Sequence, residues 1–136
     1  MKVGYAVRNI MTSDIVSLET TASLSEAMHL MVARDIGSVV VNRSGEMVGI
    51  LTERDILRRF CSDAQSAITK VEDVMSRSLV TIGDEAALGE AADLMADKKI
   101  RRLLVTENGK IKGIITERDL MRATLDVFRR LTDAWI

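Results

Sequence analysis

The sequence contains the same segment twice. Residues 49–56 read GILTERDI and residues 113–120 read GIITERDL, so they differ only where one aliphatic residue replaces another. A shift of 64 positions aligns residues 7–58 with residues 71–122 without a gap, and 19 of the 52 aligned positions are identical. A repeat this regular predicts one supersecondary unit used twice. Because about 55 residues alone bury a poor core, we expect the two copies to pack against each other around a pseudo-twofold axis.

Each copy is predicted to have the order β-α-β-β-α. The segment 23–35 has apolar residues at helical spacing and begins with the Ser-x-x-Glu spacing of a capping box. Glycine-containing turns separate the second and third strands, which we expect to be antiparallel. The final helix of each copy begins in the TERD sequence. The predicted strands are 14–18, 37–41 and 47–51 in the first copy and 78–82, 102–106 and 111–115 in the second.

The predicted fold class is α/β, more narrowly α+β. The two pseudo-symmetric repeats span 7–60 and 71–124, and we expect them to pack sheet to sheet. The last helix is expected to continue as an extended C-terminal tail over 125–136. Hydrophobic residues make up 47% of the chain, which is enough for a packed core.

Composition excludes several classes of function. The net charge is −1, with 7 basic and 8 acidic residues in positions 1–64 and 12 of each in 65–136, whereas nucleic-acid binders carry a basic excess. The single cysteine, Cys61, cannot form an internal disulfide, and no Cys/His cluster suggests a metal site. No stretch reaches the about 18 apolar residues of a membrane span, and the N-terminus lacks a signal-peptide segment. We therefore expect a cytoplasmic protein without a membrane partner.

The TERD segments have one purely structural explanation. Thr52 and Asp55, like Thr116 and Asp119, have capping-box spacing with Asp in place of Glu. A threonine at the N-cap accepts a hydrogen bond from a backbone N–H of the first turn, and an acid three residues later suits the helix dipole. Capping alone therefore accounts for threonine and aspartate in both copies.

A second explanation is a nucleotide site. Capping requires neither Gly49 nor Gly113, and a glycine inside a strand often marks the close approach of a ligand or of another backbone. The N-terminus of a helix is a ready site for phosphate. A carboxylate one turn into the helix can accept two hydrogen bonds from a ribose diol. Both explanations stay open on the spacing alone.

The pattern Gly-aliphatic-aliphatic-Thr-x-x-Asp-aliphatic, present twice in these repeats, resembles a tandem pair of CBS domains, named after cystathionine β-synthase. The resemblance covers about Val7 to Arg122. It implies a module with two clefts that bind adenosyl compounds: AMP, ADP, ATP, S-adenosylmethionine or its breakdown products, and sometimes NAD. It also implies pairing of modules into a disc-shaped homodimer, and regulation of a partner protein without catalysis.

The resemblance implies that each cleft takes residues from both copies. The aspartates are expected to hold ribose hydroxyls, the threonines to contact ribose or phosphate, and the aliphatic residues to sandwich adenine. One cleft is expected to comprise Thr116, Arg118 and Asp119 with Ser13, Ile15, Ile36, Gly37 and Ser38. The other is expected to comprise Thr52, Arg54 and Asp55 with Arg77, Leu79, Ile100, Arg101 and Arg102.

The two clefts are expected to differ. Gly37-Ser38 in the first copy becomes Arg101-Arg102 in the second, and Lys98 and Lys99 add positive charge nearby. Because arginine binds phosphate through a planar fork of donors, the sequence favours AMP or ADP, with ATP also compatible, over S-adenosylmethionine. The alternative is that these arginines pair with surface acids such as Glu107. Two arginines are also expected to narrow one cleft.

The remaining polar and aromatic residues suggest no catalysis. His29 has no nucleophile at a recognisable spacing, so we expect a solvated helical histidine, and we expect Cys61 to be partly exposed and inert. Phe128 and Trp135 are expected to cover a subunit interface or the flank of the module. The leading hypothesis is thus a non-enzymatic adenine-nucleotide sensor without a catalytic cofactor. The alternatives are a sensor of S-adenosylmethionine-type ligands and an adaptor with empty clefts.

Overall fold

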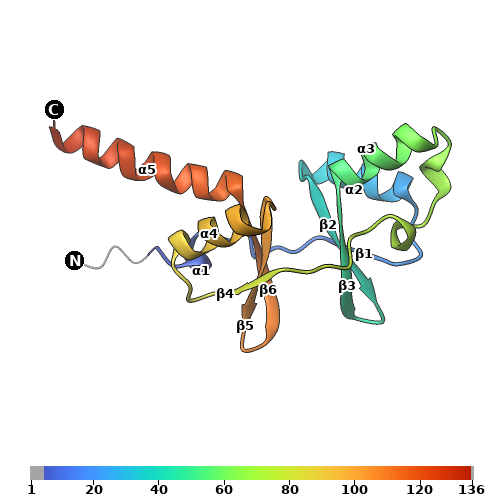
Figure 1. Cartoon of the computed structure of the whole chain (residues 1–136), viewed down its shortest axis with the longest axis horizontal. Helices are drawn as coiled ribbons and strands as arrows, with labels where there is room; N and C mark the ends of the chain where they lie inside the picture. Colours follow the sequence, from blue (N-terminus) through green and yellow to red (C-terminus); the bar gives the residue numbers. More distant parts are fainter. Residues whose placement is uncertain (1–4, 136) are drawn as a thin grey trace. The chain divides into compact units, whose positions relative to one another are not determined.

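The computed structural model describes residues 5–135, and Figure 1 shows the arrangement of the helices and strands. The chain divides into two units that do not follow the order of the sequence copies. The first-copy unit consists of Ile15–Leu79. The second-copy unit combines Val80–Ile136 with Met1–Asp14, so each unit joins the body of one copy to the beginning of the other.

The first-copy unit contains a three-stranded sheet in the order β1-β2-β3. Strand β1 runs parallel to β2, whereas β2 and β3 form an antiparallel hairpin. Helices α2 and α3 pack on this sheet. In chain order, its elements are β1 (Ser17–Glu19), α2 (Leu24–Arg34), β2 (Ser38–Arg43), β3 (Glu46–Thr52), α3 (Glu53–Ser62) and the short 3₁₀ helices η1 (Ser66–Ile68) and η2 (Val71–Asp73).

The second-copy unit repeats this architecture with the sheet order β4-β5-β6. Its last helix is the longest of the described chain and continues past its own sheet, as Figure 1 shows in red. The element order confirms the predicted β-α-β-β-α repeat and the extended C-terminal helix. The elements are α1 (Val7–Ile10), β4 (Thr81–Gly83), α4 (Leu88–Lys98), β5 (Arg102–Glu107), β6 (Lys110–Thr116) and α5 (Glu117–Trp135).

Helix α2 illustrates how the sequence pattern produces the core. Ser23 caps the helix, because its Oγ accepts a hydrogen bond from the backbone N–H of Glu26 at 3.1 Å. The predicted apolar stripe faces inward: Leu24, Ala27 and Met31 are buried, and Met28 lies at the edge of the cluster. This stripe packs against the strand residues Val39, Val41 and Leu51.

The two hairpins turn through residues in the left-handed region. Ser44 and Gly45 have φ angles of 51° and 82°, and Asn108 and Gly109 have φ angles of 52° and 78°. Two consecutive positive φ angles define the tight turn whose twist matches that of the flanking strands. The structure therefore confirms the predicted glycine turns.

The N-terminal arm, defined here as residues 5–14, completes the second-copy unit. Val7 is fully buried, and its backbone N–H donates to the Ala86 carbonyl at 2.8 Å. Further along, Thr12 and Ile114 of β6 exchange two backbone hydrogen bonds of 2.9 and 3.0 Å. The arm is therefore an integral part of this unit.

Residues 71–76 occupy the equivalent position in the first-copy unit. Val71 is fully buried and donates its backbone N–H to the Ala22 carbonyl at 2.8 Å. Ser76 and Ile50 of β3 exchange two backbone hydrogen bonds of 2.9 Å each. The same packing arrangement thus occurs in both units, with Val7 and Val71 at equivalent positions.

The first strand of each unit is shorter than the sequence predicted. The predictions were 14–18 and 78–82, but β1 and β4 begin three residues later. The chain passes from one unit to the other at these points, so pairing starts only when the Val16 and Val80 carbonyls accept hydrogen bonds from β2 and β5, at 3.0 and 3.1 Å. The short helices α1, η1 and η2 were not predicted, because three or four residues show no periodicity. Among the described residues, no helix is long and apolar enough to cross a membrane.

Candidate ligand-binding site

The first TERD segment forms the predicted cap at the start of α3. Thr52 Oγ1 accepts from the backbone N–H of Asp55 at 3.2 Å, and Asp55 Oδ2 accepts from the backbone N–H of Thr52 at 3.0 Å. Two N–H groups that the helix cannot satisfy internally are thereby paired. The structural explanation of the first TERD segment is therefore confirmed.

The second TERD segment has the same geometry at the start of α5. Asp119 Oδ2 accepts from the backbone N–H of Thr116 at 2.9 Å and from its Oγ1 at 3.0 Å, and Thr116 Oγ1 accepts from the Asp119 N–H at 3.3 Å. Both aspartates are only half-buried. In these contacts each cap uses the Oδ2 oxygen, so capping does not occupy the Oδ1 oxygens of Asp55 and Asp119.

The two strand glycines are explained by a neighbouring backbone. A Cβ added to Gly113 would lie 2.8 Å from the Thr12 carbonyl oxygen and 2.7 Å from Met11 Sδ. A Cβ added to Gly49 would lie 2.9 Å from the Ser76 carbonyl oxygen. A glycine inside a strand can indicate that either a ligand or another backbone comes close. At both positions the structure shows another backbone. These glycines cannot count as support for a ligand.

The start of β5 and the start of α5 meet in what we call the second-copy corner, residues 98–102 and 116–119. The backbone N–H of Glu117 donates to the Arg101 carbonyl at 2.9 Å, and Arg102 lies opposite Thr116 in the strand register. Arg101 Nε lies 3.9 Å from Glu117 Oε2, and both side chains are mostly exposed. The sequence alternative, that these arginines pair with surface acids such as Glu107, is therefore confirmed for Arg101, although its partner is Glu117 because the backbone contact brings these two residues together.

The first-copy corner, residues 34–38 and 52–55, has the same backbone with different side chains. The Glu53 N–H donates to the Gly37 carbonyl at 3.0 Å, and Ser38 lies opposite Thr52. The Glu53 carboxylate lies against Gly37, 3.3 Å from where a Cβ would be. Each TERD segment is therefore brought together with residues 36–38 or 100–102 of its own copy.

The other predicted site residues are spread over both units. Four apolar ones (Ile15, Ile36, Leu79 and Ile100) are half-buried, and four polar ones (Ser13, Arg54, Arg77 and Arg118) are exposed. Ile36 packs against the first-copy core and Ile100 against the second-copy core. The predicted clefts combine Thr116 with Ile36 and Thr52 with Ile100, which belong to different units, so these combinations stay predictions.

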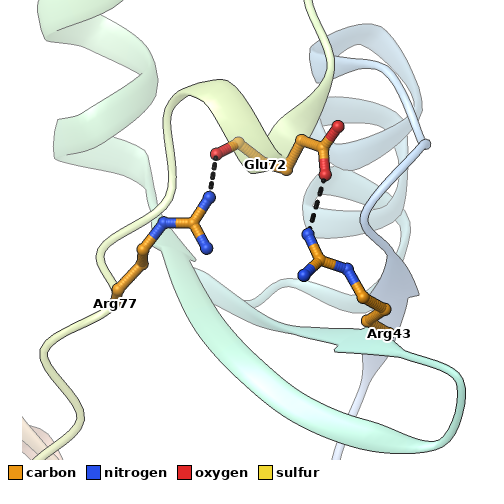
Figure 2. A network of polar contacts seen from close by, with 3 residues as sticks. All are labelled: Arg43, Glu72 and Arg77. Atoms are coloured by element: carbon orange, nitrogen blue, oxygen red, sulfur yellow. Dashed lines mark hydrogen bonds and ion pairs between the residues drawn. The ribbon is translucent and has the colours of Figure 1, made fainter.

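Arg77 takes part in a polar network that the sequence did not reveal. Figure 2 shows its guanidinium directed at Glu72, whose carbonyl accepts from Arg77 Nη2 at 3.5 Å. The Glu72 carboxylate accepts in turn from Arg43 Nη2 at 3.3 Å. The repeat gives no sign of this network, because position 72 aligns with Arg8 in the first copy. Arg77 is thus held near η2.

His29 and Cys61, to which no ligand role was assigned, both lie at exposed positions. His29 Nδ1 lies 2.7 Å from the Ser25 carbonyl on an exposed helical turn, as predicted. Cys61 is exposed, where the sequence predicted a partly exposed thiol. The part of the chain that the structure describes contains no group of three residues that could hold a metal ion. Phe128 is exposed, whereas the Trp135 side chain lies outside the described side chains.

The CBS domain family model matches residues 7–62 and 71–126, so this chain belongs to the CBS domain family and contains a tandem pair of these domains. An uncharacterised protein of Methanopyrus kandleri is 35% identical over 122 residues, which are 88% of this chain and 62% of that protein. The chain thus spans less than two thirds of this relative's length.

Solved structures confirm the fold. The crystal structure of an uncharacterised conserved protein from Pyrococcus horikoshii has a TM-score of 0.83 and 36% identity, covering 91% of this chain and 95% of that one. The protein CBSX2, solved in complex with AMP, has a TM-score of 0.75 and 27% identity, covering 91% of this chain and 98% of that one. The family resemblance and the fold class drawn from the sequence are therefore confirmed. CBS domain pairs are ligand-binding regulatory modules.

Proposed function

We propose that this chain is a regulatory module that binds an adenine nucleotide, AMP or ADP, and signals its presence to a partner protein without a catalytic step. The observation that carries the proposal is the second-copy corner. There the helix cap leaves Asp119 Oδ1 unused, and Arg102 lies opposite Thr116 in the register. The AMP complex of CBSX2 supports the ligand class at 27% identity.

The chemistry of the corner suits a nucleoside monophosphate. Asp119 is half-buried, and its unused oxygen offers an acceptor for ribose hydroxyls while Oδ2 holds the cap. Phosphate would be attracted by the N-terminal end of α5 and by the guanidinium groups of Arg101 and Arg102. The exposed Arg101–Glu117 pair contributes little stability, so phosphate can replace Glu117 as the partner of Arg101 at low cost. Adenine is proposed to lie against the half-buried aliphatic side chain of Ile100.

Binding is expected to stabilise the folded chain. AMP at 100 times its Kd should add about 2.7 kcal/mol to the free energy of unfolding, which thermal unfolding readily detects. ADP, ATP, S-adenosylmethionine and NAD are tested in parallel. The variant Asp119→Asn keeps one oxygen for the cap but replaces the other with a donor, so AMP affinity should fall by roughly tenfold or more.

The matched control for this prediction is Asp126→Asn, which makes the same change at an exposed position of α5 away from the cap. It should leave the AMP effect intact. Stabilisation by S-adenosylmethionine in place of AMP would favour the alternative ligand class. No stabilisation by any of the five compounds would favour the adaptor with empty clefts.

We further propose that the module forms a homodimer through α5. Four large apolar side chains on this helix are 48–64% exposed: Met121, Leu125, Phe128 and Leu131. The charged residues of the same stretch, from Arg122 to Asp133, lie on the other side of the helix by their spacing. An apolar stripe of this kind on a water-exposed helix marks an interaction surface.

Disrupting this stripe should separate the subunits. The double variant Phe128→Glu/Leu131→Glu is expected to have a mass near 15.0 kDa in light scattering after size exclusion, whereas the wild-type protein should have about twice that mass. Charge reversal on the opposite side, Arg129→Glu, is the control and should leave the dimer intact. A wild-type protein that is already monomeric at all concentrations would refute the proposed interface.

A further inference from the structure

Two segments of the chain dock in the same way on the two units. One is the N-terminal arm, and the other, here called the central arm, is residues 69–77. Val7 and Val71 donate equivalent backbone hydrogen bonds of 2.8 Å to the carbonyls of Ala86 and Ala22. The other equivalent pairs are Tyr5–Leu88 and Thr69–Leu24, Arg8–Asp84 and Glu72–Thr20, and Thr12–Ile114 and Ser76–Ile50. The backbone contacts therefore do not distinguish one arm from the other.

The apolar contacts do not distinguish the arms either. Val7 and Val71 are identical, and both are fully buried. Met11 and Met75 are also identical, and each packs in the core of the unit that its arm joins. The structure shows crossed docking, in which each arm joins the body of the other copy. By its backbone and apolar contacts, each arm also fits the body of its own copy, an alternative that we call own-copy docking.

The chain is long enough for own-copy docking. Ser76 pairs with Ile50, which lies opposite Val40, and Val40 in turn lies opposite Ser17. In own-copy docking Thr12 would take the place of Ser76, in the same row as Ser17. This row spans three strand spacings, or about 14 Å, whereas the five residue steps from 12 to 17 reach about 17 Å. The second-copy unit has the same register, so the length of the connection does not force the crossing.

Charge does distinguish the two arms. Arg8 and Glu72 occupy equivalent positions, each directly after the buried valine. Figure 2 shows the Glu72 carboxylate directed at Arg43, whose Nη2 lies 3.3 Å from Glu72 Oε2. In the second-copy unit, Arg8 Nη1 lies 3.7 Å from Glu85 Oε1. Each arm therefore faces an opposite charge on the unit that it joins.

The repeat extends this charge inversion to the surroundings of both residues. Three aligned positions contact residue 8 or residue 72 in at least one unit, and they carry one positive charge in the first-copy unit but three negative charges in the second. These positions are Thr20, Thr21 and Arg43 in the first copy and Asp84, Glu85 and Glu107 in the second. Own-copy docking would place Arg8 beside Arg43, and Glu72 beside the three acids. Like charges of this kind disfavour a wrong partner.

We propose that Arg8 and Glu72 assign each arm to its unit, so that charge selects crossed docking. The crossing gives the two units two covalent connections, between residues 14 and 15 and between residues 79 and 80. Own-copy docking would leave one connection, in the linker between the copies. The inference goes beyond the proposed function, because it concerns how the tandem pair is assembled and does not depend on a ligand.

Exchanging the two charges tests the assignment. In Arg8→Glu/Glu72→Arg, both arms match the body of their own copy and mismatch the unit that they join in the wild-type protein. Two interactions are lost in crossed docking and two are gained in own-copy docking. Because an exposed pair changes a population ratio by roughly two- to fivefold, the four together should shift the ratio towards own-copy docking by roughly tenfold to several hundredfold. The matched control is Arg58→Glu/Asp93→Arg, which exchanges a base and an acid at exposed positions of α3 and α4.

Nuclear Overhauser effects in the full-length variants show which arm lies on which unit. Contacts of Val7 with Ala86 and of Val71 with Ala22 report crossed docking. Contacts of Val7 with Ala22 and of Val71 with Ala86 report own-copy docking. The wild-type protein and the control should show the crossed set alone, whereas the exchange variant should show the own-copy set in addition or instead.

A rescue variant adds Arg43→Glu/Glu85→Arg to the exchange, which restores opposite charges in both crossed contacts. It should return the spectrum to the crossed set alone, and persistence of the own-copy set there would overturn the assignment. An exchange variant that folds with the crossed set alone would also overturn it, because the arms would then find their units without these charges. So would an exchange variant that loses its folded spectrum without own-copy contacts, because the charges would then stabilise docking without selecting it.

Discussion

Alanine at Gly113 is expected to lower the free energy of unfolding by about 3 kcal/mol, because its Cβ would overlap a neighbouring backbone. The added atom would lie 2.8 Å from the Thr12 carbonyl oxygen, a distance that real Cβ atoms do not adopt. The arm must then move, and the two hydrogen bonds between Thr12 and Ile114 are lost or weakened. Chemical denaturation followed by circular dichroism measures the change.

The matched control for this prediction is Gly89→Ala. Gly89 lies in the first turn of α4 and has no atom within 4 Å of an added Cβ. Alanine there should raise the free energy of unfolding by about 0.5–1 kcal/mol through its better helix propensity. If both alanines had the same small effect, the close approach of the arm to β6 would be refuted.

Removal of residues 1–14 is expected to unfold the second-copy unit. Among the described contacts, the arm contributes five backbone hydrogen bonds to this unit and buries Val7 completely. At about 1 kcal/mol for each hydrogen bond and about 2 kcal/mol for the buried valine, the loss is comparable to the total stability of a small domain. In amide NMR spectra, the resonances of β4, β5 and β6 should therefore collapse to the random-coil region.

The control for the arm is Arg8→Ala in the full-length chain. Arg8 is exposed, and its ion pair with the exposed Glu85 has a separation of 3.7 Å, so the change should stay within about 0.5 kcal/mol. A truncated chain that retained dispersed resonances for β4, β5 and β6 would contradict the structural role of the arm.

The regular elements were predictable from the sequence because local physics determines them. The stripe in α2, the glycine turns and the TERD caps each depend on residues close together in the sequence, and each is confirmed. The crossing of the chain between units was not predictable. Val7 and Val71 are identical in the repeat, so the apolar pattern does not indicate that each packs in the unit formed by the other copy.

The candidate site was predictable only in part, because some of its contacts join residues that are distant in the sequence. The sequence proposed Gly49 and Gly113 as possible marks of a ligand, whereas their neighbours are the backbones of residues 12 and 76. The pairing of Arg101 with Glu117 depends on a backbone hydrogen bond between residues 16 positions apart in the sequence. The sequence placed each TERD segment beside residues 36–38 or 100–102 of the other copy, whereas the structure shows it beside those of its own copy, and the clefts predicted across the copies stay predictions.

Amide NMR during a titration with AMP tests the central claim most directly, because it reports both binding and its location. We predict saturable shifts for Arg101, Arg102, Thr116 and Asp119, which Asp119→Asn reduces in proportion to the lost affinity. Shifts that never saturate, or that are confined to residues outside both corners, would contradict the claim that the TERD corners bind an adenine nucleotide.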